Sequence, residues 1–232
     1  MRPFEHVLVA PAPRKDRSGS LPRAPIRKRI PIVLLPGFLG SDLTMAPMRS
    51  MLRNAGYDAL PWNLGANRGP VAGLIEAVVA RVGEVAEASG GRVALVGHSL
   101  GGLYCREVAR ITPQLVEMVV TLGSPIRALE LRKRGNDLDI VSLIEYVSGR
   151  TVADLQRERL FCDMASPLPI RCVSIYSKRD RVAPWQMCLQ IPSCLAENVE
   201  IDSTHRGMVV SRGVVQIISN CLSAVTDVAQ SA

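Results

Sequence analysis

The segment Gly97-His98-Ser99-Leu100-Gly101 carries the strongest chemical signal in this sequence of 232 residues. It follows the apolar run 92–97 and opens a helical pattern over 100–111. A serine at so sharp a strand-to-helix turn takes strained backbone angles and projects its hydroxyl, and flanking glycines remove Cβ atoms that would clash. The pattern predicts that Ser99 is a nucleophile; the alternative is a glycine-rich turn with an idle serine.

A serine hydroxyl becomes reactive when a general base accepts its proton. The sequence offers three histidines. His6 lies in the N-terminal arm, and His98 is expected to point away from its neighbour on the tight turn. His205, in the segment DSTHRGM, is therefore the predicted base, with a purely structural histidine as the alternative. A lysine base is disfavoured because the chain contains no Ser-x-x-Lys motif.

A catalytic histidine also needs an acid that fixes its tautomer and stabilises its charged form. Asp180 follows the predicted strand 172–177 in SIYSKRDRVAPW, and so it should lie at the same sheet edge as the serine. Asp202, three residues before the histidine, is the competitor, but its strand position should aim it away from the cleft. The remaining candidate acids lie in the segment 126–165: Glu130, Asp137, Asp139 and Asp163.

The oxyanion of an acyl-transfer intermediate needs two N–H donors. The backbone amide of Leu100, directly after the serine, is the first candidate. The second should come from the loop PGFLG (36–40), where Phe38 is preferred and Leu39 is the alternative. A third interpretation is that this loop is only a glycine turn.

The elements that must position these groups alternate along the chain. Continuous apolar runs predict buried strands, and apolar residues at helical spacing predict helices between them. Such strands are typical of a parallel sheet covered on both faces, so we expect an α/β fold with a mostly parallel sheet of about six strands. Strands are predicted at 30–36, 57–64, 92–97, 116–124, 172–177 and 198–202, and helices at 44–56, 71–88, 100–111 and 208–225.

Residues 126–165 interrupt this alternation with a charged stretch, a helical pattern over 139–149 and a capping-box sequence at Thr151–Asp154. We predict a small helical cap over the carboxyl edge of the sheet; a long crossover helix is the alternative. The expected organisation is a basic, proline-rich arm at 1–29, contributing at most one strand (FEHVLVA), and one domain at 30–232.

Net charge is concentrated in the arm. Residues 1–30 hold eight basic and two acidic residues, which accounts for six of the seven net positive charges. The rest of the chain is nearly neutral. This disfavours nucleic-acid binding, because nucleic-acid-binding proteins usually carry a cluster of basic residues on the surface of the folded domain. The arm is either a solvated segment or a contact for anionic lipid or another acidic partner.

Cysteine spacing and hydropathy bound the remaining properties. The six cysteines include no Cys-x-x-Cys pair, and the histidines are far apart, so the spacing of a zinc site is absent. We expect mostly buried thiols, with a bridge between Cys188 and Cys194 as a minor alternative. No apolar run reaches about 18 residues, and the N-terminus lacks an apolar signal core. A cytoplasmic protein is expected, with peripheral membrane association as the variant.

From residue 30 to about 225 the chain resembles the lipase and esterase branch of the α/β-hydrolases. The matching segments are LLPGF, GHSLGG, TLGSP, SKRDRVAPW and STHRGM. The order Ser99, Asp180, His205 is that of the family. Pro36 departs from the pattern, since many relatives have histidine there.

The resemblance implies hydrolysis of an ester through an acyl-serine intermediate, without metal or cofactor. The modest, charged segment 126–165 favours small to medium acyl esters or lipid-like esters over long-chain triglycerides. The alternatives are an acyltransferase or thioesterase with the same three residues, a non-catalytic binding module, and a membrane-docked interaction protein. The oligomeric state is left open.

Overall fold

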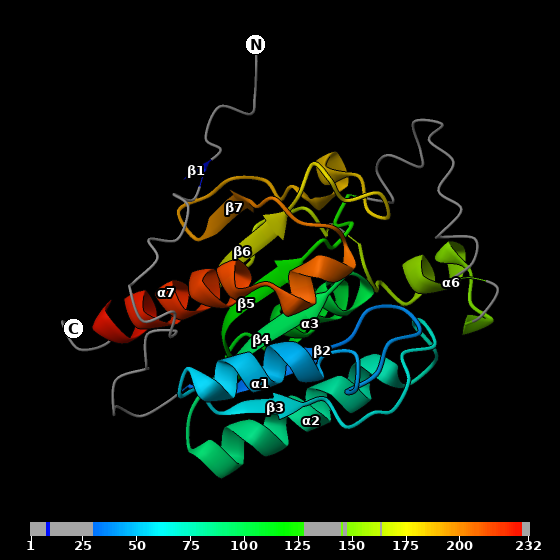
Figure 1. Ribbon diagram of the computed structural model, residues 1–232. Helices are drawn as coiled ribbons and strands as arrows, with labels where there is room; N and C mark the ends of the chain where they lie inside the picture. The colour runs from blue at the N-terminus through cyan, green and yellow to red at the C-terminus, as the bar shows by residue number, and fades with distance from the viewer. Residues whose placement is uncertain (1–7, 10–29, 128–144, 146–147, 163, 229–232) are drawn as a thin grey trace.

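The computed structural model describes residues 8–9, 30–127, 145, 148–162 and 164–228 (Figure 1). Its centre is a seven-stranded, fully parallel sheet with the strand order β1-β7-β6-β5-β4-β2-β3. The strands are β1 (Leu8–Val9), β2 (Ile32–Leu35), β3 (Ala59–Pro61), β4 (Val93–His98), β5 (Val116–Leu122), β6 (Arg171–Tyr176) and β7 (Ala196–Glu200). Six of them fall where the apolar runs predict strands. The seventh, β1, has two residues and pairs with β7, so residues 8–9 of the basic arm add an edge strand.

The sheet confirms the reason for expecting parallel strands. Every residue of β2 is buried, and so are all but one residue in each of β4, β5 and β6. Strands buried on both faces cannot alternate between polar and apolar residues.

Strand order reverses at β2, which pairs with both β3 and β4. The chain leaves β2 through helix α1 (Ala46–Asn54) to β3, and returns through helix α2 (Leu74–Ser89) to β4. Because all strands are parallel, the loops after them emerge at one edge of the sheet. Crevices at the carboxyl edge of such a switch point are where α/β proteins bind ligands.

Two helical layers enclose the sheet (Figure 1). Helices α1 and α7 (Arg212–Val228) pack on one face, where Met48 and Leu52 of α1 join Ile218 of α7 in one buried cluster. Helices α2 and α3 (Leu100–Ile111) pack on the other face through Val82 and Val108. Apolar side chains therefore cover both faces of the sheet, and the loops at its carboxyl edge are the part of the sheet that the helices leave uncovered.

The last predicted helix begins four residues later than expected. Residues 206–210 form a 3₁₀ turn, η2 (Arg206–Val210), and α7 starts at Arg212. Ser211 ends that turn, and its hydroxyl accepts a hydrogen bond from the amide of Val214 at 3.3 Å. The apolar pattern continues across this junction, which is why periodicity alone misses the break.

Part of the segment 126–165 is described. The capping box at Thr151 and Asp154 is confirmed, with hydrogen bonds in both directions, and it starts helix α6 (Val152–Arg157). Beyond α6, Phe161 packs on Tyr104 of α3 with ring centroids 5.8 Å apart. This end of the segment therefore joins the core on the α3 face. Most of the helix predicted over 139–149, and with it half of the predicted cap, lies outside the described residues, as do residues 1–7 and 10–29 of the arm.

All six cysteines are free thiols, including Cys188 and Cys194. Four of them are buried, as expected. Among the residues that the structure describes, no helix has the length and apolar character needed to cross a bilayer.

Candidate active site

Ser99 lies at the junction between β4 and α3 with φ 53° and ψ −120°. A positive φ at a non-glycine residue is uncommon and marks strain that the surrounding structure must impose. The Ser99 amide donates to the carbonyl of Leu122, the last residue of β5, at 2.8 Å. The serine is thereby held at the carboxyl edge of the sheet, as the elbow pattern predicts.

Gly97 and Gly101 are required by the closeness of the backbone at this turn. A Cβ at Gly97 would lie 2.5 Å from the carbonyl carbon of Gly101, and a Cβ at Gly101 would lie 2.4 Å from the carbonyl oxygen of Leu35. Real Cβ atoms do not approach backbone atoms so closely. The glycine spacing therefore reflects the packing of α3 against β2 and β4.

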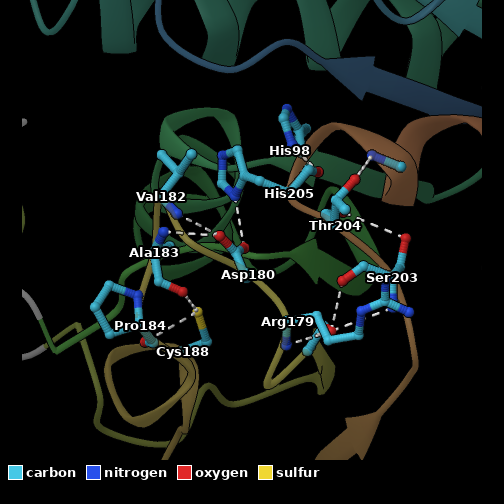
Figure 2. A network of polar contacts seen from close by, with 12 residues as sticks. His98, Arg179, Asp180, Val182, Ala183, Pro184, Cys188, Ser203, Thr204 and His205 are labelled. Atoms are coloured by element: carbon cyan, nitrogen blue, oxygen red, sulfur yellow. Dashed lines mark hydrogen bonds and ion pairs between the residues drawn. The ribbon is translucent and has the colours of Figure 1, made fainter.

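His205 and Asp180 form a buried pair (Figure 2). The Nδ1–H of His205 donates to Oδ2 of Asp180 at 2.6 Å. The other carboxylate oxygen, Oδ1, accepts the amides of Val182 at 2.8 Å and Ala183 at 2.9 Å. Burial alone would raise the pKa of the Asp180 carboxyl, but the hydrogen bonds from His205 and from Ala183 outweigh it and leave this pKa below its usual value. The aspartate therefore stays ionised.

Gly123 connects this pair to the elbow. It follows Leu122, which binds the Ser99 amide, and its φ is +54°. A Cβ at Gly123 would lie 2.9 Å from Oδ2 of Asp180 and 3.1 Å from Nδ1 of His205. Consecutive residues at the end of β5 thus contact the serine on one side and the histidine–aspartate pair on the other. Three segments distant in sequence meet at this edge.

The competing acid, Asp202, has a different partner. It pairs with the guanidinium of Arg179 at 3.0 Å, and both side chains are exposed to solvent. The structure therefore brings Asp180, rather than Asp202, to His205. The four candidate acids of the segment 126–165 lie outside the described residues.

The loop after β2 lies directly against the serine. A Cβ at Gly37 would lie 3.1 Å from the Cβ of Ser99. The amide of Leu39 donates to the carbonyl of Asn67 at 2.7 Å, so this alternative donor is already engaged. Phe38, which follows Gly37 in this loop, stays the predicted donor. The sequence did not predict the contact of Leu39 with Asn67, because a single asparagine in a polar loop carries no recognisable pattern.

The first candidate donor, the amide of Leu100, belongs to the first residue of α3. N–H groups in the first turn of a helix have no intrahelical acceptor and lie at the positive end of the helix dipole. The two predicted donors therefore come from two different segments, the start of α3 and the loop after β2.

His98 has a role that sequence reasoning missed. Its Nε2–H donates to the backbone carbonyl of His205 at 3.0 Å, and the two rings lie 4.6 Å apart between centroids. Burial, followed by the neighbouring His205, lowers the pKa of the His98 imidazole from 6.5 to about 4. His98 is therefore neutral at pH 7. Within the described parts of the chain, no group of three or more His, Cys, Asp or Glu side chains could hold a metal ion.

Residues 7–200 match the alpha/beta hydrolase family. The chain belongs to this family. The match includes Ser99 and Asp180 and ends before His205. The chain is 37% identical over 112 residues to a triacylglycerol lipase of Pseudarthrobacter phenanthrenivorans and to one of Burkholderia plantarii. The matched region covers 44% of this chain but only 35% and 31% of those lipases.

A solved structure supports the same fold. The monoacylglycerol lipase of Paleococcus ferrophilus superposes with a TM-score of 0.58 at 15% identity, over 85% of this chain and 96% of that chain. At such low identity the likeness concerns the fold alone, and it agrees with the parallel sheet and its two helical layers.

Proposed function

We propose that the protein is a serine carboxylic-ester hydrolase that acts on small to medium acyl esters through an acyl-serine intermediate. The observation that carries this proposal is the 2.6 Å hydrogen bond between Nδ1 of His205 and Oδ2 of Asp180, at the sheet edge that also holds Ser99. A buried histidine held by an ionised carboxylate is the arrangement that activates a serine hydroxyl.

In the first half of the reaction, Oγ of Ser99 attacks the ester carbonyl carbon while Nε2 of His205 accepts its proton. Because Nδ1 is engaged by Asp180, Nε2 is the nitrogen left for this transfer. The oxyanion that forms accepts hydrogen bonds from the amides of Phe38 and Leu100. When the intermediate collapses, the imidazolium returns its proton to the departing alkoxide, and the acyl group stays on the serine.

In the second half, water replaces the alcohol. His205 accepts a proton from the attacking water, and the second tetrahedral intermediate uses the same two amides. Its collapse releases the carboxylic acid and returns the proton to Oγ of Ser99. The balance is one ester and one water in, one alcohol and one acid out. Asp180 stays ionised throughout and stabilises the imidazolium.

The substrate class rests on two supports. The partial relatives are triacylglycerol lipases, which favours an ester with an apolar acyl group. The segment 126–165 is short and charged, which favours an acyl group of small to medium length over a long chain. The basic arm is proposed to contact anionic lipid only weakly.

The nucleophile is tested by comparing Ser99→Ala with Ser124→Ala. Ser124 is a buried serine after β5 whose hydroxyl has no hydrogen-bond partner among the residues that the structure describes, so its loss should be nearly neutral. A fluorophosphonate probe should label the parent and Ser124→Ala but not Ser99→Ala, and hydrolysis of p-nitrophenyl butyrate should follow the same pattern. Labelling of Ser99→Ala at the parental rate would refute the nucleophile.

The substrate class is tested with a series of p-nitrophenyl esters and with an added alcohol, amine or thiol acceptor. We expect kcat/KM to peak at butyrate to octanoate and to fall for palmitate, with free acid as the main product. If most of the acyl group goes to the acceptor, or a thioester is cleaved far faster than its oxygen ester, the enzyme is an acyltransferase or a thioesterase instead.

A further inference from the structure

His98 contacts the base in two ways that differ in kind (Figure 2). Its Nε2–H is hydrogen bonded to the main-chain carbonyl of His205 at 3.0 Å. Its ring also lies against the ring of His205, with centroids 4.6 Å apart and an angle of 48° between the planes. Backbone and side chain of His205 are therefore both held by one residue, which directly precedes Ser99 in the chain.

This contact complements the bond to Asp180. The carboxylate of Asp180 fixes one atom of the imidazole, Nδ1. A ring held at a single atom can still swing about that bond, and the segment that carries it, between β7 and η2, can still shift. The contact with His98 restricts this freedom, because it fixes the backbone from which the His205 side chain extends and places a second ring beside the imidazole.

The charges around His98 suit a permanent donor. Burial and the neighbouring His205 and Arg206 disfavour the protonated ring, while Asp180 and the His205 carbonyl favour it. The outcome is a neutral ring whose single proton is on Nε2, where the carbonyl accepts it. A neutral ring avoids placing a second positive charge beside His205 when that residue accepts a proton.

We propose that His98 is a positioning residue that fixes the general base to the same rigid turn that carries the nucleophile. This proposal rests on the proposed serine-hydrolase function. Ser99 and His98 are consecutive residues at the strained end of β4, so any movement of the elbow carries the base with it. A displacement of about 1 Å between reacting groups can cost about 100-fold in rate, and the contacts between His98 and His205 would prevent such a displacement.

The test uses two variants that separate the two contacts. His98→Phe keeps a flat ring against His205 and removes the donor, whereas His98→Gln keeps an N–H donor and removes the ring. We expect His98→Phe to lower kcat for p-nitrophenyl butyrate by about 10- to 100-fold with KM within about twofold of the parent. His98→Gln should recover a large part of that loss. A residue that only supports folding would not show this split or this recovery.

A second readout needs no substrate. The proton between Nδ1 of His205 and Oδ2 of Asp180 should give a downfield ¹H resonance, which we expect to broaden or vanish in His98→Phe and to persist in His98→Gln. If both variants keep the parental kcat and the resonance, or if kcat falls equally in both while the resonance is unchanged, the positioning role is wrong. Should Ser99→Ala keep its label while the resonance still depends on His98, the proposed function fails and the positioning of His205 stands.

Discussion

Asp180 divides its two carboxylate oxygens between different tasks. Oδ2 accepts the Nδ1–H of His205, and Oδ1 accepts the amides of Val182 and Ala183 from the loop that Asp180 itself begins. The loop thus orients the carboxylate, and the carboxylate orients the imidazole. A neutral amide in place of the carboxylate would present an N–H where an acceptor is needed or would leave the imidazolium unstabilised.

Asp180→Asn should therefore lower kcat for p-nitrophenyl butyrate by about 1,000- to 10,000-fold with little change in KM. The matched control is Asp202→Asn, since Asp202 is exposed and pairs with Arg179. It should keep parental kinetics. Steady-state rates of the three proteins decide the point: a larger loss in Asp202→Asn than in Asp180→Asn would reverse the assignment of the acid.

At the scale of elements, the elbow depends on how closely α3 approaches β2. A Cβ at Gly101 would lie 2.4 Å from the carbonyl oxygen of Leu35 and 2.6 Å from that of Pro36, both backbone atoms that cannot rotate away. Gly101→Ala should lower the free energy of unfolding by about 3 kcal/mol. Gly83→Ala is the control, because its Cβ would meet no heavy atom within 4 Å and alanine favours the helix by about 0.5–1 kcal/mol. Urea denaturation should show a lower free energy of unfolding than the parent for Gly101→Ala and a higher one for Gly83→Ala.

Helix α3 is also tied to the segment that leads into β6. Arg106 is fully buried, and its guanidinium donates to the carbonyls of Met164 and Ser166, each at 2.7 Å, and to Oε1 of Gln190 at 2.8 Å. Burial lowers the pKa of this guanidinium, but three oxygen acceptors surround it. The bonds hold the chain that returns from residues 126–165 against the α3 face.

Arg106→Met should cost about 3–5 kcal/mol of unfolding free energy, because it leaves buried carbonyls without a donor. Arg157→Met removes an exposed arginine paired with Asp154 in α6 and should leave the unfolding midpoint nearly unchanged. Urea denaturation of both proteins measures the difference. Equal midpoints in the two variants would show that the buried network contributes no net stability.

At the scale of the whole molecule, the lowered pKa of His98 predicts that the fold loses stability in acid. The unfolded state binds a proton at this residue near pH 6.5, whereas the folded state does so only near pH 4. Between these values the unfolded state holds more protons, so the free energy of unfolding falls as pH falls. Asp180 acts at lower pH: its carboxylate stabilises the fold above its ordinary pKa of 3.8, and this contribution is lost as pH falls through its lowered folded pKa.

The pH range governed by His98 can be separated from the lower range governed by Asp180 by comparing the parent with His98→Gln. Between about pH 7.5 and pH 5 the parent should lose about 2 kcal/mol more unfolding free energy than the variant, since 1.5 pH units below 6.5 correspond to that amount. The groups that face His98 are His205, Asp180 and Arg206, and all three remain in the variant. Parallel curves for the two proteins would contradict the lowered pKa.

Much of this molecule follows from local sequence patterns. The buried apolar runs predict six of the seven strands within a few residues, and the alternation of strands with helices predicts the parallel sheet. The glycine spacing around Ser99 predicts the strained turn, and the Thr151–Asp154 pattern predicts its capping box. Each of these features is decided by residues close together in the chain, through period, sterics or short hydrogen bonds.

Contacts between distant segments depended on the tertiary structure. The sequence left Asp180 and Asp202 as rival acids for His205, and Phe38 and Leu39 as rival donors; only packing shows which carboxylate meets the imidazole and which amide is taken by Asn67. The sequence also gave no sign of the hydrogen bond between His98 and His205. Adjacent residues on a turn diverge, and His205, the partner of His98, lies 107 positions further along the chain. Side-chain type and local spacing state what chemistry a residue is capable of, but the partner it meets is set by how the sheet brings its strand ends together.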